Sequence, residues 1–195
     1  VGIIEIKRYT TIARDGVFQL EEKKSIFFAA CKRVENVQDA ESFLNSQREK
    51  FPDASHHVYA WVIGGASDQI YKRFSDDGEP HGTSGPPVLD VLVKRNIVDT
   101  VIVVTRYFGG TLVGTGGLVK AYGSAAAGVI RVAGLQDMLP AYSYRLSFPY
   151  RFVDQLTHRL GLMQITIANR DFQSSVHFHC LVNVDKLEGF LSGVQ

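Results

Sequence analysis

Hydrophobic and polar positions follow strand and helix periods in turn through the first 134 residues, which indicates an α+β or α/β unit. After Asn36, apolar residues recur at helical spacing, and Asp39 stands where an N-capped helix carries an acidic residue. Pro86 and Leu118 begin two further helical stretches, which end near residues 95 and 132. Strands are expected at 24–34, 57–63 and 97–107, the last two apolar on both faces as in the interior of a sheet.

The last sixty residues follow a plainer βαββα pattern. Gly134 can end a helix and Pro140 opposes its continuation, so residues 133–140 are expected to form a linker between domains 1–134 and 135–195. Ferredoxin-like domains run βαββαβ, so a last strand either lies beyond Gln195 or is missing. The expected elements are strands at 142–148, 162–168 and 172–182, a helix at 150–160, a turn at 169–171 and a last helix capped by Asp185.

Composition excludes several classes of protein. The chain of 195 residues is 45% hydrophobic and 21% charged, unlike a disordered, collagen-like or disulfide-rich sequence. No apolar run approaches the ~20 residues of a membrane-spanning helix, so no membrane partner is expected. Glu5, Lys7 and Arg8 argue against a signal peptide, and Cys31 and Cys180 are far apart, so a reducing, cytoplasmic location is expected. The formal net charge of +1 means that any nucleic-acid site is a local patch.

An acidic segment at 74–87, FSDDGEPHGTSGPP, is the first candidate site. Asp76, Asp77 and Glu79 offer oxygen ligands for a metal or a polar ligand, although their spacing is not that of an EF-hand. His56, just before an expected strand, is a candidate base or ligand beside them. The alternative is a polar turn whose side chains hydrogen-bond their own backbone.

A glycine-rich segment at 106–122 is the second candidate. Its glycines lie between a strand and a helix, where bare backbone N–H groups bind anions, and Arg106 and Lys120 add positive charge. The segment is neither a Walker A loop nor a GxGxxG fingerprint, because Val119 stands where the third glycine belongs. The alternative is that the glycines serve positive φ and close packing of the helix on the sheet.

Other polar residues carry weaker signals. His56 and His57 are adjacent on a strand and therefore face opposite sides. His177 and His179 share one strand face and are expected on the surface of a sheet. Because Ser84 is not part of a nucleophile elbow, no signature of a nucleophilic enzyme is visible there.

Three motifs in order resemble the IMPACT family, whose bacterial members are the YigZ-type proteins. They are Ala54-Ser-His-His, FSDDGEPHGTSG at 74–85 and VVTRYFGGTLVGTGGLVKAY at 103–122. The resemblance spans about residues 23–132, and His81 and Leu112-Val113 depart from the usual pattern.

The resemblance implies an α+β protein with a ribosomal protein S5 domain 2-like domain followed by a ferredoxin-like domain. This pair is similar to the last two domains of elongation factor G, and eukaryotic relatives regulate translation. The resemblance and the glycine-rich segment together lead to the prediction of a non-enzymatic protein, without catalytic residues or cofactor, that binds RNA, the ribosome or a translation-related protein. The expected binding residues are Arg106, Tyr107, Gly109, Gly110, Gly114, Thr115, Gly116, Gly117, Lys120, His56, Asp76, Asp77 and Glu79.

Two alternatives stay open at this point. One is a small metal-dependent, peptidase-like hydrolase that uses Asp76, Asp77, Glu79 and His56. The other is a pure protein–protein module. The sequence leaves open the oligomeric state and whether the acidic and glycine-rich segments form one site.

Overall fold

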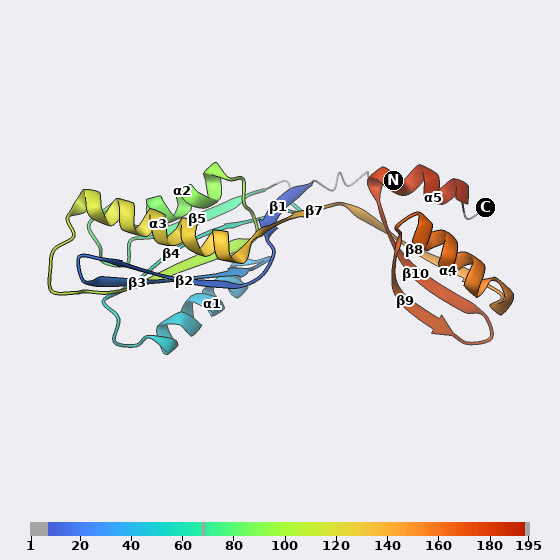
Figure 1. Ribbon diagram of the computed structural model, residues 1–195, viewed down its shortest axis with the longest axis horizontal. Coiled ribbons are helices and arrows are strands. Elements are labelled where there is room, and N and C mark those ends of the chain that lie inside the picture. Colours follow the sequence, from blue (N-terminus) through green and yellow to red (C-terminus); the bar gives the residue numbers. More distant parts are fainter. Residues whose placement is uncertain (1–7, 68, 194–195) are drawn as a thin grey trace. The chain divides into compact units, whose positions relative to one another are not determined.

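The computed structural model describes residues 8–67 and 69–193 and separates into two compact units, Val1–Met138 and Leu139–Gln195 (Figure 1). The division lies four residues beyond the boundary expected at Gly134. Glu5 and Lys7, on which the expectation about the N-terminal segment partly rests, lie outside the described residues. No helix in the described part of the chain is long and apolar enough to cross a membrane.

A five-stranded antiparallel sheet forms the centre of the first unit, in the order β2-β3-β6-β4-β5. The three strands expected from the hydrophobic pattern are its interior strands. The two edge strands were not predicted, because an edge strand meets solvent on several sides and its sequence is correspondingly mixed. The strands are β2 (Gly16–Glu22), β3 (Ser25–Arg33), β4 (His56–Ile63), β5 (Tyr71–Ser75) and β6 (Thr100–Tyr107).

Helices cover the two faces of this sheet unequally (Figure 1). The helices α2 (Gly85–Lys94) and α3 (Thr115–Ala133) pack on one face, and α1 (Val37–Lys50) packs on the other. The expected capping of α1 is confirmed, since the Asn36 side chain accepts the N–H of Asp39 at 2.8 Å.

Part of the expected linker is a strand. Residues Leu135–Met138 form β7, which pairs with β1 (Tyr9–Ile12) in a two-stranded antiparallel sheet. Local sequence gives little sign of this pairing, because the partner strand lies more than a hundred residues away. Backbone hydrogen bonding to a distant segment has overridden the loop propensity of the segment.

The second unit has the expected βαββα order, with an antiparallel sheet ordered β8-β10-β9. No strand follows its last helix within the described residues, which end at Gly193. The assignments to S5 domain 2-like and ferredoxin-like folds stay predictions. Its elements are β8 (Ala141–Phe148), a 3₁₀ turn at Tyr150–Phe152, α4 (Val153–Leu162), β9 (Thr166–Phe172), β10 (Val176–Asn183), a 3₁₀ turn at Val184–Lys186 that contains Asp185, and α5 (Leu187–Gly193).

The turn expected at 169–171 was misplaced. Arg170 and Asp171 belong to β9 and pair with Phe178 and His177 of β10, so the chain turns instead at residues 173–175. Pairing with β10 satisfies backbone groups that a turn at Asn169 would have left to solvent, and this outweighs local turn propensity.

Asp76 caps the N-terminus of α2 from the preceding turn. Its Oδ1 accepts the N–H groups of Ser84 and Gly85 at 3.1 and 2.8 Å and the Ser84 hydroxyl at 2.7 Å. Its Oδ2 accepts the N–H of Gly82 at 2.9 Å. Burial by itself raises the pKa of the Asp76 carboxyl, but these hydrogen bonds outweigh it and leave the pKa below its ordinary value.

Replacing Asp76 by asparagine should destabilise the protein in a pH-dependent way. An amide nitrogen facing these N–H donors loses at least one hydrogen bond to a largely buried group, so we expect a loss of about 1–3 kcal/mol at pH 7. Because folding lowers the pKa of Asp76, its charge-dependent stabilisation is complete above the unfolded value of about 3.9 and is lost as pH falls through the folded pKa.

Urea unfolding at pH 7 and pH 3 measures this effect. Asp90→Asn is the matched control, because Asp90 lies on the same helix in an exposed pair with Lys94, worth only about 0.3–0.5 kcal/mol. A difference between wild type and Asp76→Asn that is equal at both pH values would contradict the assignment.

Candidate functional site

A buried ion pair joins the acidic segment to the glycine-rich segment. The Glu79 carboxylate and the Arg106 guanidinium approach to 2.6 Å (Oε1 to Nη1), with side chains only 3% and 6% exposed. The Tyr122 hydroxyl, on α3, donates to the same carboxylate oxygen at 2.6 Å. The two candidate segments, separate in the sequence, therefore meet at one end of the sheet.

Arg106 also holds the start of β3. Its Nη2 donates to the Ser25 hydroxyl at 3.2 Å, and the N–H of Gly109 donates to the same oxygen at 3.2 Å. The guanidinium lies over the rings of Phe27 and Phe108, at 5.4 and 5.7 Å from their centroids. This burial differs from the expected surface contact with phosphate, because Arg106 lies at an inward-facing position of β6 and its charge is matched by a carboxylate.

Asp77 is held in the left-handed region, with φ of 46°. Its carboxylate accepts the backbone N–H of His57 at 2.6 Å and lies 3.4 Å from Arg48. Its carbonyl oxygen lies 2.8 Å from Nδ1 of His56, which must be the donor because a carbonyl only accepts. The His56 Nε2 then faces Glu79 Oε1 at 3.9 Å. Burial lowers the pKa of His57, which favours its neutral form.

The three acidic side chains therefore have separate partners. Asp76 holds the start of α2, Asp77 holds β4, and Glu79 pairs with Arg106. Within residues 8–67 and 69–193, no group of three His, Cys, Asp or Glu side chains is placed to hold a metal ion. The arrangement matches the polar-turn interpretation of this segment and offers the hydrolase alternative no preformed ligand set in that part of the chain.

The turn between β2 and β3 packs against the glycine-rich segment. A Cβ on Gly109 would lie 2.0 Å from the carbonyl oxygen of Lys24, so only glycine fits there. The Lys23 ammonium donates to the carbonyl of Val113 at 3.2 Å. Lys23 and Lys24 were missed by the sequence analysis, because only the tertiary structure brings this turn beside a segment eighty residues later.

The remaining glycines of this segment have different roles. Gly110 and Gly114 have φ of +80° and +81°, and a Cβ on Gly117 would lie 2.7 Å from Val113 Cγ1. Gly116 has neither reason to be glycine: its φ is not positive, and a Cβ there would meet nothing within 4 Å.

The N-terminus of α3 is open. The helix begins at Thr115 after Gly114, no side chain caps it, and its first turn contains no acidic residue. Thr115 and Gly116 are exposed, and Lys120 follows one turn later, also exposed. This arrangement presents backbone N–H groups and a positive charge to solvent.

Aromatic and aliphatic side chains border this end of the sheet. Phe108 is 50% exposed and Leu112 is 82% exposed, and neither is among the binding residues expected from the sequence. Tyr107, which was expected at the site, donates its hydroxyl to Asp53 at 2.8 Å and packs edge-on against Phe28. Phe108 and Leu112 belong to what we call the loop-end surface, and Tyr107 lies beside it. Its members are Lys23, Lys24, Phe108, Gly110, Leu112, Thr115, Gly116 and Lys120.

Removing one partner of the buried pair should lower the free energy of unfolding more than removing both partners does. Glu79→Gln leaves a buried guanidinium without a carboxylate, and Arg106→Met leaves a buried carboxylate without a cation, so each should lose about 3–5 kcal/mol. The double variant leaves no unpaired charge and should lose clearly less than the sum of the two.

Urea unfolding of the four proteins measures the coupling. Glu41→Gln is the control, because its pair with Arg73 is more than half exposed and should contribute under about 1 kcal/mol. Strict additivity of the two single losses would contradict a coupled buried pair.

Comparisons with known proteins test the resemblance seen in the motifs. The family model "Impact N-terminal domain" matches residues 23–130. The chain is 38% identical over 170 residues to "IMPACT family member YigZ" of Escherichia coli K12, covering 87% of this chain and 83% of that protein. It is 33% identical over 182 residues to "IMPACT family member YvyE" of Bacillus subtilis 168, covering 93% and 83%.

A solved structure agrees over nearly the whole length. It is described as the crystal structure of a hypothetical protein, with a TM-score of 0.68 and 35% identity, and the match covers 96% of this chain and 91% of that one. The residues matched by the family model include both the acidic and the glycine-rich segment. The chain therefore belongs to the IMPACT family.

Proposed function

We propose that this protein is a non-enzymatic, translation-associated protein that binds RNA through the loop-end surface. Its membership of the IMPACT family supports the association with translation that the resemblance of its motifs to that family implies. The exposed glycine and lysine positions support RNA as the ligand. Cys31 and Cys180 are buried free thiols, which accords with action in a reducing cytoplasm.

Gly116 is the observation that carries the proposal. Glycine in a helix costs about 1 kcal/mol relative to alanine, and neither backbone conformation nor packing among the described residues requires it here. Without a Cβ, the first turn of α3 admits a phosphate oxygen close to its free N–H groups, as helix N-termini do. A ligand that approaches the backbone explains a glycine that the fold itself does not need.

The charges around Gly116 suit a phosphodiester chain. Gly116 and Lys120 are four residues apart on one helix and so lie on the same face. Lys24 stands at the neighbouring turn, beside Gly109, and neither lysine is ion-paired within the described residues. Phe108 offers an exposed ring on which a base can stack. A local patch of this kind is compatible with a net charge near zero.

Arg106 is buried beneath the loop-end surface and helps to hold its backbone in place. Its guanidinium is occupied by Glu79 and Ser25, so its removal tests the fold and not the contact with RNA. A test of the proposal therefore uses exposed residues.

Gly116→Ala should make the protein more stable and a weaker RNA binder. Alanine should raise the free energy of unfolding by about 0.5–1 kcal/mol, while its methyl group obstructs the approach of phosphate to the N–H groups. Gly123→Ala is the control in the interior of the same helix, since its Cβ would lie 4.0 Å from Pro87 and it should stabilise the protein by at least as much. Thermal unfolding and fluorescence anisotropy with a single-stranded RNA 20-mer measure the two effects. Equal RNA affinity for both variants would contradict the role of Gly116.

Lys24→Ala and Lys120→Ala should weaken co-sedimentation with ribosomes and reduce its dependence on salt. Removing a lysine that neutralises a phosphate should lower the slope of log affinity against log salt by about 0.7 for single-stranded RNA. Lys72→Ala, at an exposed position of β5 near the opposite end of β4 from His56, is the control.

The same salt series separates the other possible partners. If the double variant Lys24→Ala/Lys120→Ala kept its affinity for the ribosome and the dependence of that affinity on salt, the loop-end surface would not be the part that binds the ribosome. Salt-insensitive pelleting together with no affinity for the RNA 20-mer would identify a protein partner and overturn RNA binding.

A further inference from the structure

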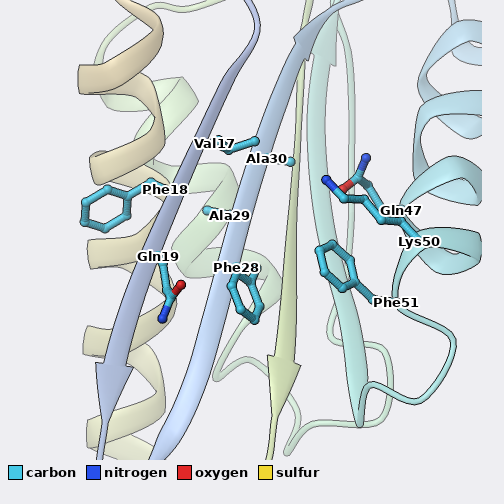
Figure 2. A pocket seen from close by; sticks show the side chains of 9 residues that line it. All are labelled: Val17, Phe18, Gln19, Phe28, Ala29, Ala30, Gln47, Lys50 and Phe51. Atoms are coloured by element: carbon cyan, nitrogen blue, oxygen red, sulfur yellow. The ribbon is translucent and has the colours of Figure 1, made fainter.

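The face of the first unit's sheet that carries α1 is only partly covered. The helix packs over β4 and β6, where Tyr59, Trp61, Val101 and Val103 form its core. Strands β2 and β3 continue beyond it without a helix of their own, and a groove of about 310 Å³ lies between them and the end of α1 (Figure 2). Its lining residues are Val17, Phe18, Gln19, Phe28, Ala29, Ala30, Gln47, Lys50 and Phe51.

The floor of the groove reaches solvent and is apolar apart from the side chain of Gln19. Val17 is 68% exposed although it stands within a strand, and Ala30 lies opposite it on β3. The ring of Phe28 stacks on that of Phe51, with centroids 5.4 Å apart and planes 12° from parallel, and Tyr107 meets both rings edge-on. These side chains form a platform of packed apolar groups that is open to solvent at Val17.

The dimensions of the bare face suit one α-helix. Two strands spaced about 4.8 Å apart give a width near 10 Å, which is the diameter of a helix with its side chains. The seven residues of β2 extend about 24 Å, close to the length of the 14-residue helix α1. A second helix beside α1 would complete a layer that α1 begins.

Charge determines what kind of helix fits. Lys50 is the one charged residue among those that line the groove, and the nearest carboxylate on this face of β2 is Glu21, which lies beyond the groove near the end of the strand. Its ammonium lies 5.3 Å from the centroid of the Phe51 ring and has no ion-pair partner in the described part of the chain. A carboxylate brought beside Lys50 would be partly shielded from water by the apolar floor, which strengthens their attraction.

We propose that this groove binds an acidic amphipathic helix of a partner protein. Apolar side chains at helical spacing would cover Val17 and the Phe28–Phe51 pair, and a Glu or Asp side chain would face Lys50. The groove lies on the α1 face of the sheet and shares no residue with the loop-end surface, so the inference does not depend on RNA binding.

A displayed library of random 16-residue peptides, selected on the wild-type full chain alone, tests this proposal. Val17 is exposed enough for the variant to fold, which its melting temperature checks. We expect the selected peptides to carry apolar residues at i, i+3 or i+4, and i+7, together with Glu or Asp. Their affinity should fall at least about tenfold on Val17→Asp and on Lys50→Glu. Leu181→Asp, at an exposed strand position of the other unit, should leave affinity unchanged.

A charge swap makes the test specific. A selected peptide in which Glu is replaced by Lys should lose affinity for wild type and regain it on Lys50→Glu. Failure to enrich any peptide, equal affinity for Val17→Asp, or enrichment of basic peptides would overturn the proposal.

Two further measurements separate other occupants. A concentration-dependent dimer that Val17→Asp abolishes would mean that a second copy of this chain fills the groove, and would overturn a partner helix. The double variant Lys24→Ala/Lys120→Ala should bind the peptide as wild type does, and the RNA 20-mer should not displace it. Displacement by RNA would show a shared surface and contradict the inference.

Discussion

The ion pair of Glu79 and Arg106 is the interaction on which the arrangement of this end of the molecule depends. It joins the turn after β5 to the end of β6. Through hydrogen bonds to Tyr122 and Ser25 it also reaches α3 and the start of β3. A buried pair holds four segments in one geometry because leaving either charge alone would be costly. The glycine-rich segment can therefore be exposed and nearly free of side chains while its position stays defined.

The two surfaces of the first unit differ in chemistry. The loop-end surface offers N–H groups, lysines and one exposed ring, which suit a flexible polyanion. The groove beside α1 offers an apolar platform with Lys50 at its rim, which suits a folded segment of protein. They share no lining residue, although Tyr107 lies beside both, because it ends β6 and packs edge-on against Phe28 and Phe51.

Much of the fold was predictable from the sequence. Apolar runs identified the interior strands β3, β4 and β6, because strands buried on both faces have few polar residues. Helix periodicity and the Asn36 cap located the helices within a few residues. The edge strands, the β1–β7 pair and the turn after β9 were missed, because each has only a weak local signal. The β1–β7 pair is in addition formed by two segments that are more than a hundred residues apart in the sequence.

The sequence by itself determined the family and the two segments that carry the site, since three ordered motifs do not depend on geometry. Only the tertiary structure decided which of their residues support the fold and which face solvent. Arg106 and Glu79 have the side chains of contact residues, yet mutual neutralisation lets them be buried. Gly109 and Gly116 are the same residue type, yet one is required by the backbone of Lys24 and the other by nothing in the described fold. Residue type fixes what a group can do, and its neighbours in space fix what it does.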